Sequence, residues 1–327
     1  MVGALARGVP EGPALVLEDP RDDVREALRS AGVEVAGWSR RQAAPEGPPS
    51  DGSFGWVGMR LPRARAELEM LVHFAAGAAA EGAELWVYGA NDEGVKSVAR
   101  RLEPFFTDPS TRATGGHARV VSATRVSRDV RARSGLDDWI ASSEVDLPWG
   151  PTQWWSCPGA FAHGRLDEGT ALLLEHLPRA ESGARVLDYG TGTGFLAAGM
   201  AGGCPDCRLW GIEPDGLAAL AARRNVPRLQ VAVGAGWGAL PDADPFDVVV
   251  SNPPYHRGKA ETLDEVDHFL GGLAVHLAPG GVARCVVQRR FPFEDRCRAA
   301  GLAPPRRVAD GGPYRVWELR AGRDRSR

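Results

Sequence analysis

Residues 185–194 read Arg-Val-Leu-Asp-Tyr-Gly-Thr-Gly-Thr-Gly, and this stretch decides the fold of the chain. Its apolar start indicates a strand, its glycines indicate a turn, and the segment from Phe195 to Ala201 has the composition of a helix. Strand, glycine turn and helix in this order form the nucleotide-binding unit of α/β proteins. The glycines permit positive φ angles and let the backbone approach a ligand closely, because no Cβ intervenes.

The spacing of the glycines separates two classes of nucleotide-binding turn. A nicotinamide-binding turn reads G-x-G-x-x-G, whereas here the glycines alternate strictly and Asp188 precedes the first of them by two positions. This pattern is typical of proteins that bind S-adenosylmethionine. We therefore predict that the Asp188 carboxylate accepts a hydrogen bond from the ammonium group of this cofactor. The turn formed by Gly190, Gly192 and Gly194 is expected to lie against the amino-acid end of the cofactor.

The next predicted strand, residues 209–212, ends at Glu213. A nucleotide-binding α/β fold usually presents a carboxylate at this position to the ribose hydroxyls, so we predict that role for Glu213. Asp215 is the alternative, although it is better placed to cap the helix that follows. The third strand, residues 231–233, is followed directly by no Asp or Asn that could bind the adenine amino group. We therefore expect the adenine to be recognised by backbone groups or by stacking on a side chain such as Trp237.

A second motif follows a fully apolar strand and reads Ser-Asn-Pro-Pro-Tyr-His over residues 251–256. Pro253 and Pro254 fix φ and remove two backbone donors, which leaves the carbonyls of this segment free to accept hydrogen bonds. An exocyclic amine needs two acceptors for its N–H groups, and the side-chain oxygen of Asn252 and the carbonyl of Pro253 can supply them. Tyr255 offers a ring on which a flat base can stack. The motif predicts methylation of a planar amino group, with Asn252 placed between the amine and the cofactor.

With these motifs the chain resembles the bacterial ribosomal RNA guanine-N2 methyltransferases of the small-subunit methyltransferase C type and their large-subunit relatives. The resemblance covers nearly the whole chain, and beyond the two motifs it includes residues 158–161, 166–173 and 312–316. It implies an α/β fold of two tandem Rossmann-like class I methyltransferase domains, the C-terminal one with a seven-stranded mixed sheet. In that family the segment before the glycine turn folds over the cofactor, which implies cofactor contacts for Phe161, Asp167 and Thr170. Asp167 could equally be a helix N-cap.

The resemblance further implies that the acceptor is the N2 amine of a guanine in ribosomal RNA, either free or in a ribosomal subunit. Glu213 departs from the family, in which a shorter Asp is usual, but it still permits a ribose contact. Two alternative acceptors stay open, adenine N6 and a protein glutamine amide, because both are methylated by enzymes with the same Asn-Pro-Pro-Tyr motif on other scaffolds. A third alternative is an inactive RNA-associated scaffold, against which the intact Asn252 and turn glycines argue.

The N-terminal half repeats the alternation of strands and helices in outline. Its first strand, residues 15–17, is followed by a segment without glycine that runs to Asp23, and no Asn-Pro-Pro occurs in this half. It cannot build the same cofactor cradle, so we predict a degenerate copy of the catalytic domain that serves stability and RNA positioning. The predicted boundaries are a degenerate domain over 1–133, a linker over 134–157 and a catalytic domain over 158–327. The tryptophans at 149, 154 and 155 are expected to pack between the domains.

Composition indicates a two-domain protein without a disulfide framework. The chain has 327 residues, of which 43% are hydrophobic and 25% charged. Its N-terminus lacks the apolar core of a signal peptide and no run is long enough to span a membrane, so we expect a cytoplasmic monomer. Five cysteines are an odd number. We expect Cys204 and Cys207, although they have metal-ligand or redox spacing, to be reduced loop thiols, and we expect no metal site.

Charge is distributed unevenly along the chain. The formal net charge of −3 gives no overall attraction to nucleic acid. Residues 284–327, however, carry 12 arginines against 5 acidic residues, and such a basic stretch can bind RNA phosphates. We predict phosphate contacts from Arg289, Arg290, Arg306 and Arg307.

Overall fold

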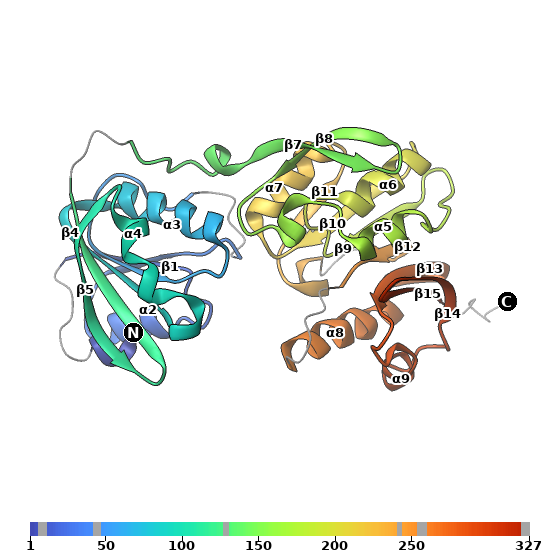
Figure 1. The fold of residues 1–327 in the computed structure, drawn as a ribbon. Helices are drawn as coiled ribbons and strands as arrows, with labels where there is room; N and C mark the ends of the chain where they lie inside the picture. Colours follow the sequence, from blue (N-terminus) through green and yellow to red (C-terminus); the bar gives the residue numbers. More distant parts are fainter. Residues whose placement is uncertain (6–11, 42–46, 127–130, 241–243, 254–259, 322–327) are drawn as a thin grey trace. The chain divides into compact units, whose positions relative to one another are not determined.

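The computed structural model of the chain describes residues 1–5, 12–41, 47–126, 131–240, 244–253 and 260–321. The chain forms two compact units, one made of residues 1–40 and 45–140 and the other of residues 41–44 and 141–327. Each unit contains a sheet with helices packed against it (Figure 1). Within the described ranges, no helix is both long enough and apolar enough to cross a membrane.

The second unit is built on a seven-stranded mixed sheet, which confirms the prediction. Its strands lie in the order β11-β10-β9-β12-β13-β15-β14. The five strands from β11 to β13 pair parallel, and β15 and β14 pair antiparallel at the edge. The strands are β9 (Arg185–Tyr189), β10 (Arg208–Glu213), β11 (Gln230–Val233), β12 (Phe246–Ser251), β13 (Leu277–Gln288), β14 (Arg306–Gly311) and β15 (Tyr314–Arg320).

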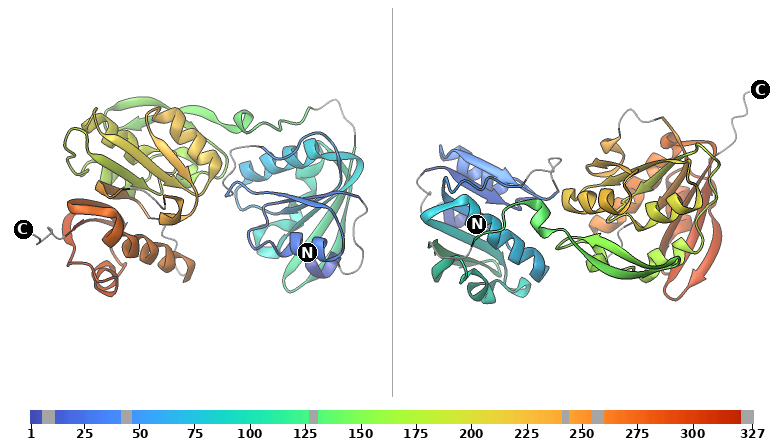
Figure 2. Two further views of the ribbon diagram at one scale, coloured as in Figure 1. Left: turned by 180° about the vertical axis from the view of Figure 1, so that it is seen from behind. Right: turned by 90° about the horizontal axis from the view of Figure 1, so that it is seen from above.

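Helices cover both faces of this sheet (Figure 2). On one face, Val186 and Val248 pack with α5 (Glu168–Leu174), α6 (Phe195–Gly203) and α7 (Gly216–Asn225). On the other face, Leu187 and Val249 pack with α8 (Ala260–His276) and α9 (Phe293–Ala299). Successive residues of a strand point to opposite faces, so a strand that is covered on both sides has to be apolar throughout.

The two motifs meet at one edge of this sheet. Ser251, the last residue of β12, pairs with Tyr189, the last residue of β9, which also pairs with Ile212 of β10. The glycine turn, Glu213 and Asn252 therefore all lie at the carboxyl ends of adjacent parallel strands. Ligands of open α/β sheets bind at this edge.

The first unit repeats this topology with one strand fewer. Its order β2-β1-β3-β4-β6-β5 matches β10-β9-β12-β13-β15-β14, and every pairing direction agrees. A counterpart of β11 is absent from the residues described for this unit. The strands are β1 (Ala14–Leu17), β2 (Val35–Trp38), β3 (Phe54–Arg60), β4 (Ala79–Ala90), β5 (Phe106–Gly115) and β6 (Ala118–Arg125). The helices are α1 (Val2–Leu5), α2 (Asp23–Ser30), α3 (Arg65–Ala78) and α4 (Ala99–Leu102), with short 3-10 turns η1 (Asn91–Glu93) and η2 (Val95–Ser97).

Carboxylates occupy the place of the glycine turn in the first unit. After β1, Glu18 accepts hydrogen bonds from the hydroxyl of Ser39 at 3.0 Å and from the backbone N–H of Arg40 at 2.9 Å. Asp19 accepts from two backbone N–H groups at the start of α2. Side chains thus fill the position at which the second unit has bare backbone.

The amine motif is also altered in the first unit. β3 is followed by Leu61 and Pro62, where β12 is followed by Asn252 and Pro253. The proline is retained, whereas a leucine that is 4% exposed stands at the position of the amide. The first unit therefore has the fold of the second without its glycine turn and without the amide.

The predicted linker, residues 134–157, contains a β-hairpin. The 3-10 turn η3 (Leu136–Trp139) precedes β7 (Ala141–Leu147), which pairs antiparallel with β8 (Gly150–Ser156). β7 is exposed along most of its length, and apolar residues alternate with polar ones only at its end, at Val145 and Leu147, which is too short a pattern to indicate a strand. Trp154 is 2% exposed and stacks on Phe195 with a centroid distance of 4.3 Å. Trp154 therefore packs inside the second unit, which includes residues 141–327, and the expectation that it packs between the domains is wrong.

Candidate functional site

The glycine turn joins the carboxyl end of β9 to α6. Gly190, Gly192 and Gly194 have φ angles of +74°, +55° and +97°, a region that residues with a side chain rarely adopt. A Cβ added at Gly190 or Gly192 would meet no protein atom within 4 Å, whereas one at Gly194 would lie 3.5 Å from Ala222 of α7. Gly190 and Gly192 therefore border open space, while Gly194 allows the turn to pack on α7.

Asp188 is buried beneath this turn with one oxygen unpaired. Its Oδ2 atom accepts hydrogen bonds from the hydroxyl of Thr191 at 2.7 Å and from the backbone N–H of Ala197 at 3.0 Å. Its Oδ1 atom is buried and has no hydrogen-bond partner among the described residues. Burial raises the pKa of Asp188 to about 6. A buried carboxylate oxygen without a donor is costly, so this atom fits the ammonium group of a ligand.

Glu213 ends β10 and contacts the same turn. Its carboxylate accepts hydrogen bonds from the backbone N–H of Gly192 at 2.8 Å and of Asp215 at 2.9 Å. Burial raises the pKa of Glu213 to about 7. Each carboxylate oxygen keeps a further lone pair that a ribose hydroxyl can use. Asp215 caps α7, because its Oδ1 atom accepts from the N–H groups of Leu217 and Ala218.

Trp237 packs in the core and offers no face to an adenine ring. Its side chain, in the 3-10 turn η5 (Gly236–Ala239), is 5% exposed. The indole stacks on His276 at a centroid distance of 4.5 Å and lies against Tyr189 and Phe269. The expected stacking role of Trp237 is therefore wrong, because residues of α8 pack on the ring and bury it.

Asn252 is held by two residues from the start of α5. Its Nδ2 atom donates to the hydroxyl of Thr170 at 2.9 Å and to the carboxylate of Asp167 at 3.3 Å. Asp167 is also the N-cap of α5 and accepts from the backbone N–H groups of Gly169 and Thr170. A carboxylate attracts the NH₂ end of an amide and repels its oxygen, so this contact sets the amide orientation. Both N–H groups are thus engaged, and Oδ1 is the atom of Asn252 that can accept from a substrate.

Two of the other predicted site residues are described by the structure, and two are not. Pro253 is buried directly after Asn252, and Phe161, in the 3-10 turn η4 (Phe161–Gly164), is 56% exposed. Pro254 and Tyr255 lie outside the described residues.

Contacts from the β7–β8 hairpin brace the glycine turn. Trp154 Nε1 donates to the hydroxyl of Thr193 at 3.0 Å. Asn225, at the end of α7, donates to the carbonyls of Thr193 and Trp155 at 2.8 Å each and accepts from the N–H of Trp155. Sequence reasoning missed this brace, because an asparagine at a helix end gives no local sign of a partner 70 residues away.

The predicted phosphate-binding arginines are all exposed and do not form one patch. Arg289 and Arg290 follow directly after β13, Arg307 pairs with Asp310 at 3.5 Å, and Arg306 pairs with Glu318 at 3.0 Å. These two carboxylates lie at different levels of the β14–β15 hairpin.

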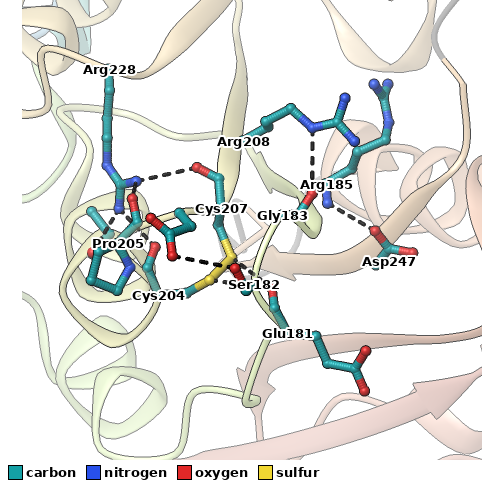
Figure 3. The surroundings of a disulfide bond; sticks show 12 residues. Glu181, Ser182, Gly183, Arg185, Cys204, Pro205, Cys207, Arg208, Arg228 and Asp247 are labelled. Carbon is teal, nitrogen blue, oxygen red and sulfur yellow. Dashed lines mark hydrogen bonds between the residues drawn. A yellow bond between two sulfur atoms is a disulfide. The ribbon is translucent and has the colours of Figure 1, made fainter.

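Cys204 and Cys207 form a disulfide in the loop after α6 (Figure 3). The expectation of reduced loop thiols is therefore wrong for this pair, whereas Cys157, Cys285 and Cys297 are free and buried. The guanidinium of Arg228 donates to the carbonyls of both bonded cysteines and so holds the loop closed. In the part of the chain that is described, no group of three or more His, Cys, Asp or Glu side chains is arranged to hold a metal ion.

Two protein families match the chain. The methyltransferase small domain matches residues 152–316, and the methyltransferase small domain N-terminal matches residues 11–142. The chain is 30% identical over 249 residues to ribosomal RNA small subunit methyltransferase C of Shewanella halifaxensis, which covers 76% of this chain and 72% of that protein. It is 29% identical over 332 residues to the protein of the same name from Hahella chejuensis, which covers 95% of each.

A solved structure shares the fold of the whole chain. It is that of the T. thermophilus 16S rRNA N2 G1207 methyltransferase in complex with AdoMet and guanosine. The TM-score is 0.79 at 21% sequence identity, and the match covers 98% of this chain and 91% of the other. At this identity the likeness establishes the fold.

Proposed function

This chain belongs to the methyltransferase small domain family, and we propose that it transfers the methyl group of S-adenosylmethionine to the N2 amine of a guanine in ribosomal RNA. The observation that carries the proposal is the oriented amide of Asn252 at the edge where the glycine turn borders open space. All of these groups belong to one unit, which supports action as a monomer. Ribosomal RNA as the substrate supports a cytoplasmic location.

The cofactor would be held by residues of the β9 and β10 ends. The unpaired Oδ1 of Asp188 would accept from its ammonium group, Gly190 and Gly192 would border its amino-acid part, and Glu213 would accept from its ribose hydroxyls. S-adenosylmethionine supplies an electrophilic methyl group when it is bound. Phe161 is exposed near the start of α5 and is the candidate to cover the ligand.

The amine would be held by the segment after β12. Oδ1 of Asn252 and the carbonyl of Pro253 would accept its two N–H groups, which leaves the nitrogen lone pair to face the methyl group. A nitrogen becomes acidic as it is alkylated, so the chain needs no strong base and the proton leaves to water. Catalysis then comes mainly from the orientation of two reactants, which can be worth several kcal/mol, on the order of 7–11 in favourable cases. Pro254 and Tyr255 complete the proposed amine site, with Tyr255 as the stacking surface.

A labelling experiment tests this function. Small ribosomal subunits from a strain that lacks the gene, and the RNA extracted from them, are incubated with the protein and methyl-labelled cofactor. The RNA is then separated from protein and digested to nucleosides. We expect label in N2-methylguanosine, and the preferred form of the substrate follows from comparing intact subunits with free RNA. Label in protein or in adenosine would support a glutamine or adenine-N6 acceptor instead, and no label would support the scaffold.

A further inference from the structure

Six arginines at the edge of the sheet gather around two carboxylates. Asp310 pairs with Arg289 at 3.6 Å, Arg307 at 3.5 Å and Arg315 at 2.8 Å. We call these four residues the Asp310 cluster. Glu318 pairs with Arg306 and Arg320 at 3.0 Å each and with Arg284, and these four residues are the Glu318 cluster. Each cluster places three cations on one anion and so has a formal surplus of positive charge.

The Asp310 cluster lies at the same edge of the sheet as the amine motif. Ser251, the end of β12, is level with Cys285, whereas β13 continues to Gln288. Arg289 therefore lies beyond the carboxyl end of β12. Asn252, which follows directly after β12, lies at the same end of the sheet. The backbone N–H of Arg289 donates to the carbonyl of Pro313 at 2.7 Å, which ties the β14–β15 turn to this position.

The same turn packs against the helix that orients Asn252. A Cβ on Gly169 of α5 would come within 3.1 Å of the ring of Tyr314, and the backbone N–H of Gly169 donates to the capping carboxylate of Asp167. Neighbouring strands are about 4.8 Å apart, so β15, two strands from β12, lies roughly 10 Å away. Arg315 lies on β15, whereas Asp310 and Arg307 lie on β14, one strand further out and roughly 14 Å from β12. The Asp310 cluster therefore lies beside the proposed amine site, within reach of the nucleotides that flank the target.

The Glu318 cluster faces the amino ends of the parallel strands, and its central pair, Glu318 and Arg284, is buried. In the pairing of β13 with β15, Glu318 lies opposite Arg284, and Arg315 lies opposite a residue three positions later in β13. The two levels are therefore roughly 10 Å apart along the strands. The side chains of Glu318 and Arg284 are 1% and 12% exposed, whereas those of Arg306 and Arg320 are 64% and 65% exposed, so the two clusters differ in the end of the sheet that they face and not in the exposure of their outer arginines. Glu318 and Arg284 line a cavity with residues 178–184, which precede β9 at its amino end. This cluster holds β13, β14 and β15 together.

The exposed side chains of the Asp310 cluster are free to bind further anions. Arg289 and Arg307 are 49% and 58% exposed, and Arg315 makes the shortest bond to the shared carboxylate. That bond and the nearby arginine charges lower the pKa of Asp310, so it stays ionised and anchors the arginines near neutral pH. Arg290 is exposed next to them, and the described residues give it no ion pair. A guanidinium held by one carboxylate still has N–H donors for a phosphate.

We propose that the Asp310 cluster and Arg290 bind the backbone phosphates that flank the target nucleotide, and that the Glu318 cluster does not bind RNA. The proposal rests on the proposed function for the identity of the nucleic acid. It divides the four arginines predicted from sequence, because Arg289 and Arg307 belong to the Asp310 cluster and Arg290 lies next to it, whereas Arg306 belongs to the Glu318 cluster. Backbone contacts of this kind set the register of the RNA, while Asn252 selects the amine.

Two charge-matched double variants of the full chain test this division. Arg289→Ala with Arg307→Ala and Arg306→Ala with Arg320→Ala each remove two positive charges and leave one arginine on the carboxylate. The probe is small-subunit ribosomal RNA freed of protein, and its dissociation constant is measured from 50 to 200 mM salt. We expect the first variant to bind roughly tenfold or more weakly at 0.1 M salt, with a logarithmic salt slope shallower by roughly 1.4, about 0.7 for each lost contact. The second variant should bind within about twofold of the unmodified chain, and cofactor affinity should be unchanged in both.

The results for the two variants and for guanine methylation distinguish the division between the clusters from the proposed function. Equal weakening in both variants would mean that only overall charge matters, and no weakening in either would mean that RNA binds elsewhere; both results overturn the division. If only the first variant bound RNA more weakly and the unmodified chain did not methylate guanine, RNA binding by the Asp310 cluster would be supported and the proposed function would be refuted. If the unmodified chain methylated guanine and bound RNA as tightly as both double variants, the proposed function would be supported and this inference would be refuted.

Discussion

Nδ2 of Asn252 lies 3.3 Å from Oδ1 of Asp167, a residue 85 positions earlier in the chain that also caps α5. One carboxylate therefore starts a helix and orients the amide that is proposed to hold the substrate. The capping bonds are local, whereas the contact with Asn252 is tertiary. The two roles can thus be separated by substitution.

Asp167→Asn should preserve the helix and impair catalysis. Asparagine caps helices as well as aspartate, so the free energy of unfolding should change by less than about 0.5 kcal/mol. A neutral amide no longer forces the NH₂ group of Asn252 to face it, and we expect kcat to fall roughly tenfold, about 1.4 kcal/mol in the barrier. Asn252→Ala sets the lower limit, with a loss of about a hundredfold or more at near-normal cofactor affinity.

Asp215→Asn provides the stability control for this experiment, since Asp215 caps α7 through two backbone N–H groups in the same way. Methyl transfer and thermal unfolding are measured on all variants. An unchanged kcat in Asp167→Asn would show that Asp167 acts only as a cap.

Gly192→Ala should weaken cofactor binding without displacing any protein atom. The added Cβ meets nothing within 4 Å, so it would project into the space assigned to the ligand. The φ of +55° imposes a conformational cost of about 1–2 kcal/mol on alanine. Gly183→Ala is the matched control, because Gly183 has a φ of +77° with the same open surroundings and lies before the amino end of β9. Calorimetry should show similar unfolding in both variants and a raised dissociation constant only in Gly192→Ala.

The buried carboxylates predict opposite pH dependences for stability and for cofactor binding. In the folded protein the pKa of Asp188 is raised from 3.8 to about 6 and that of Glu213 from 4.5 to about 7. Because the folded values are the higher ones, the free protein should lose stability as pH rises from about 4 to 7. Binding of an ammonium group needs ionised Asp188, so cofactor affinity should instead increase as pH rises through about 6.

Asp188→Asn should remove the pH dependence that is due to this residue. At pH 8 the variant should unfold at a higher temperature than the parent while binding cofactor poorly, because it no longer buries a charge. Differential scanning calorimetry and cofactor titrations from pH 5 to 8 provide both measurements. A cofactor affinity that stays flat over this range would contradict the assignment of Asp188 to the ammonium group.

The hairpin before the catalytic sheet should be required for cofactor binding. A fragment of residues 141–327 retains Trp154, whose indole stacks on Phe195 and donates to Thr193 in the glycine turn. A fragment of residues 158–327 lacks it, and loss of a buried tryptophan costs about 3–5 kcal/mol. We expect the longer fragment to bind S-adenosylmethionine and the shorter one to bind weakly or to unfold. In the full chain, Trp154→Phe keeps the stacking and isolates the hydrogen bond, at a cost of about 1 kcal/mol.

The sequence predicted those parts of the fold whose causes are local. Three alternating glycines after an apolar run indicate a strand, a turn and a helix, and the chain has β9, the turn and α6 at these positions. The apolar run before the second motif indicated a strand within a parallel sheet, and β12 lies there between β9 and β13. In both cases the chemical signal and the structure fall within about ten residues of one another.

The features that sequence reasoning missed depend on partners far away in the chain. Nothing near Trp237 shows that its ring will pack on His276, and the polar pattern of β7 hides a strand that is ordered by pairing with β8. Cys204 and Cys207 have a spacing that suits thiols, metals and disulfides alike. The roles of Asn252, Asp188 and Glu213 toward ligands stay predictions, which the structure makes specific by showing which of their atoms are already engaged.

Leu61 of the first unit stands at the position of Asn252 in the second unit. Both units follow one plan of strand order, and the leucine is buried with 4% exposure. Leu61→Asn would bury an amide, at a cost of about 1–3 kcal/mol if the amide found no partner, and the segment after β1 would still carry the carboxylates of Glu18 and Asp19. Leu61→Asn alone would therefore not give the first unit the glycine turn of the second. The first unit differs from the second at two separate places on one fold, and both would have to change before it could offer the same set of groups.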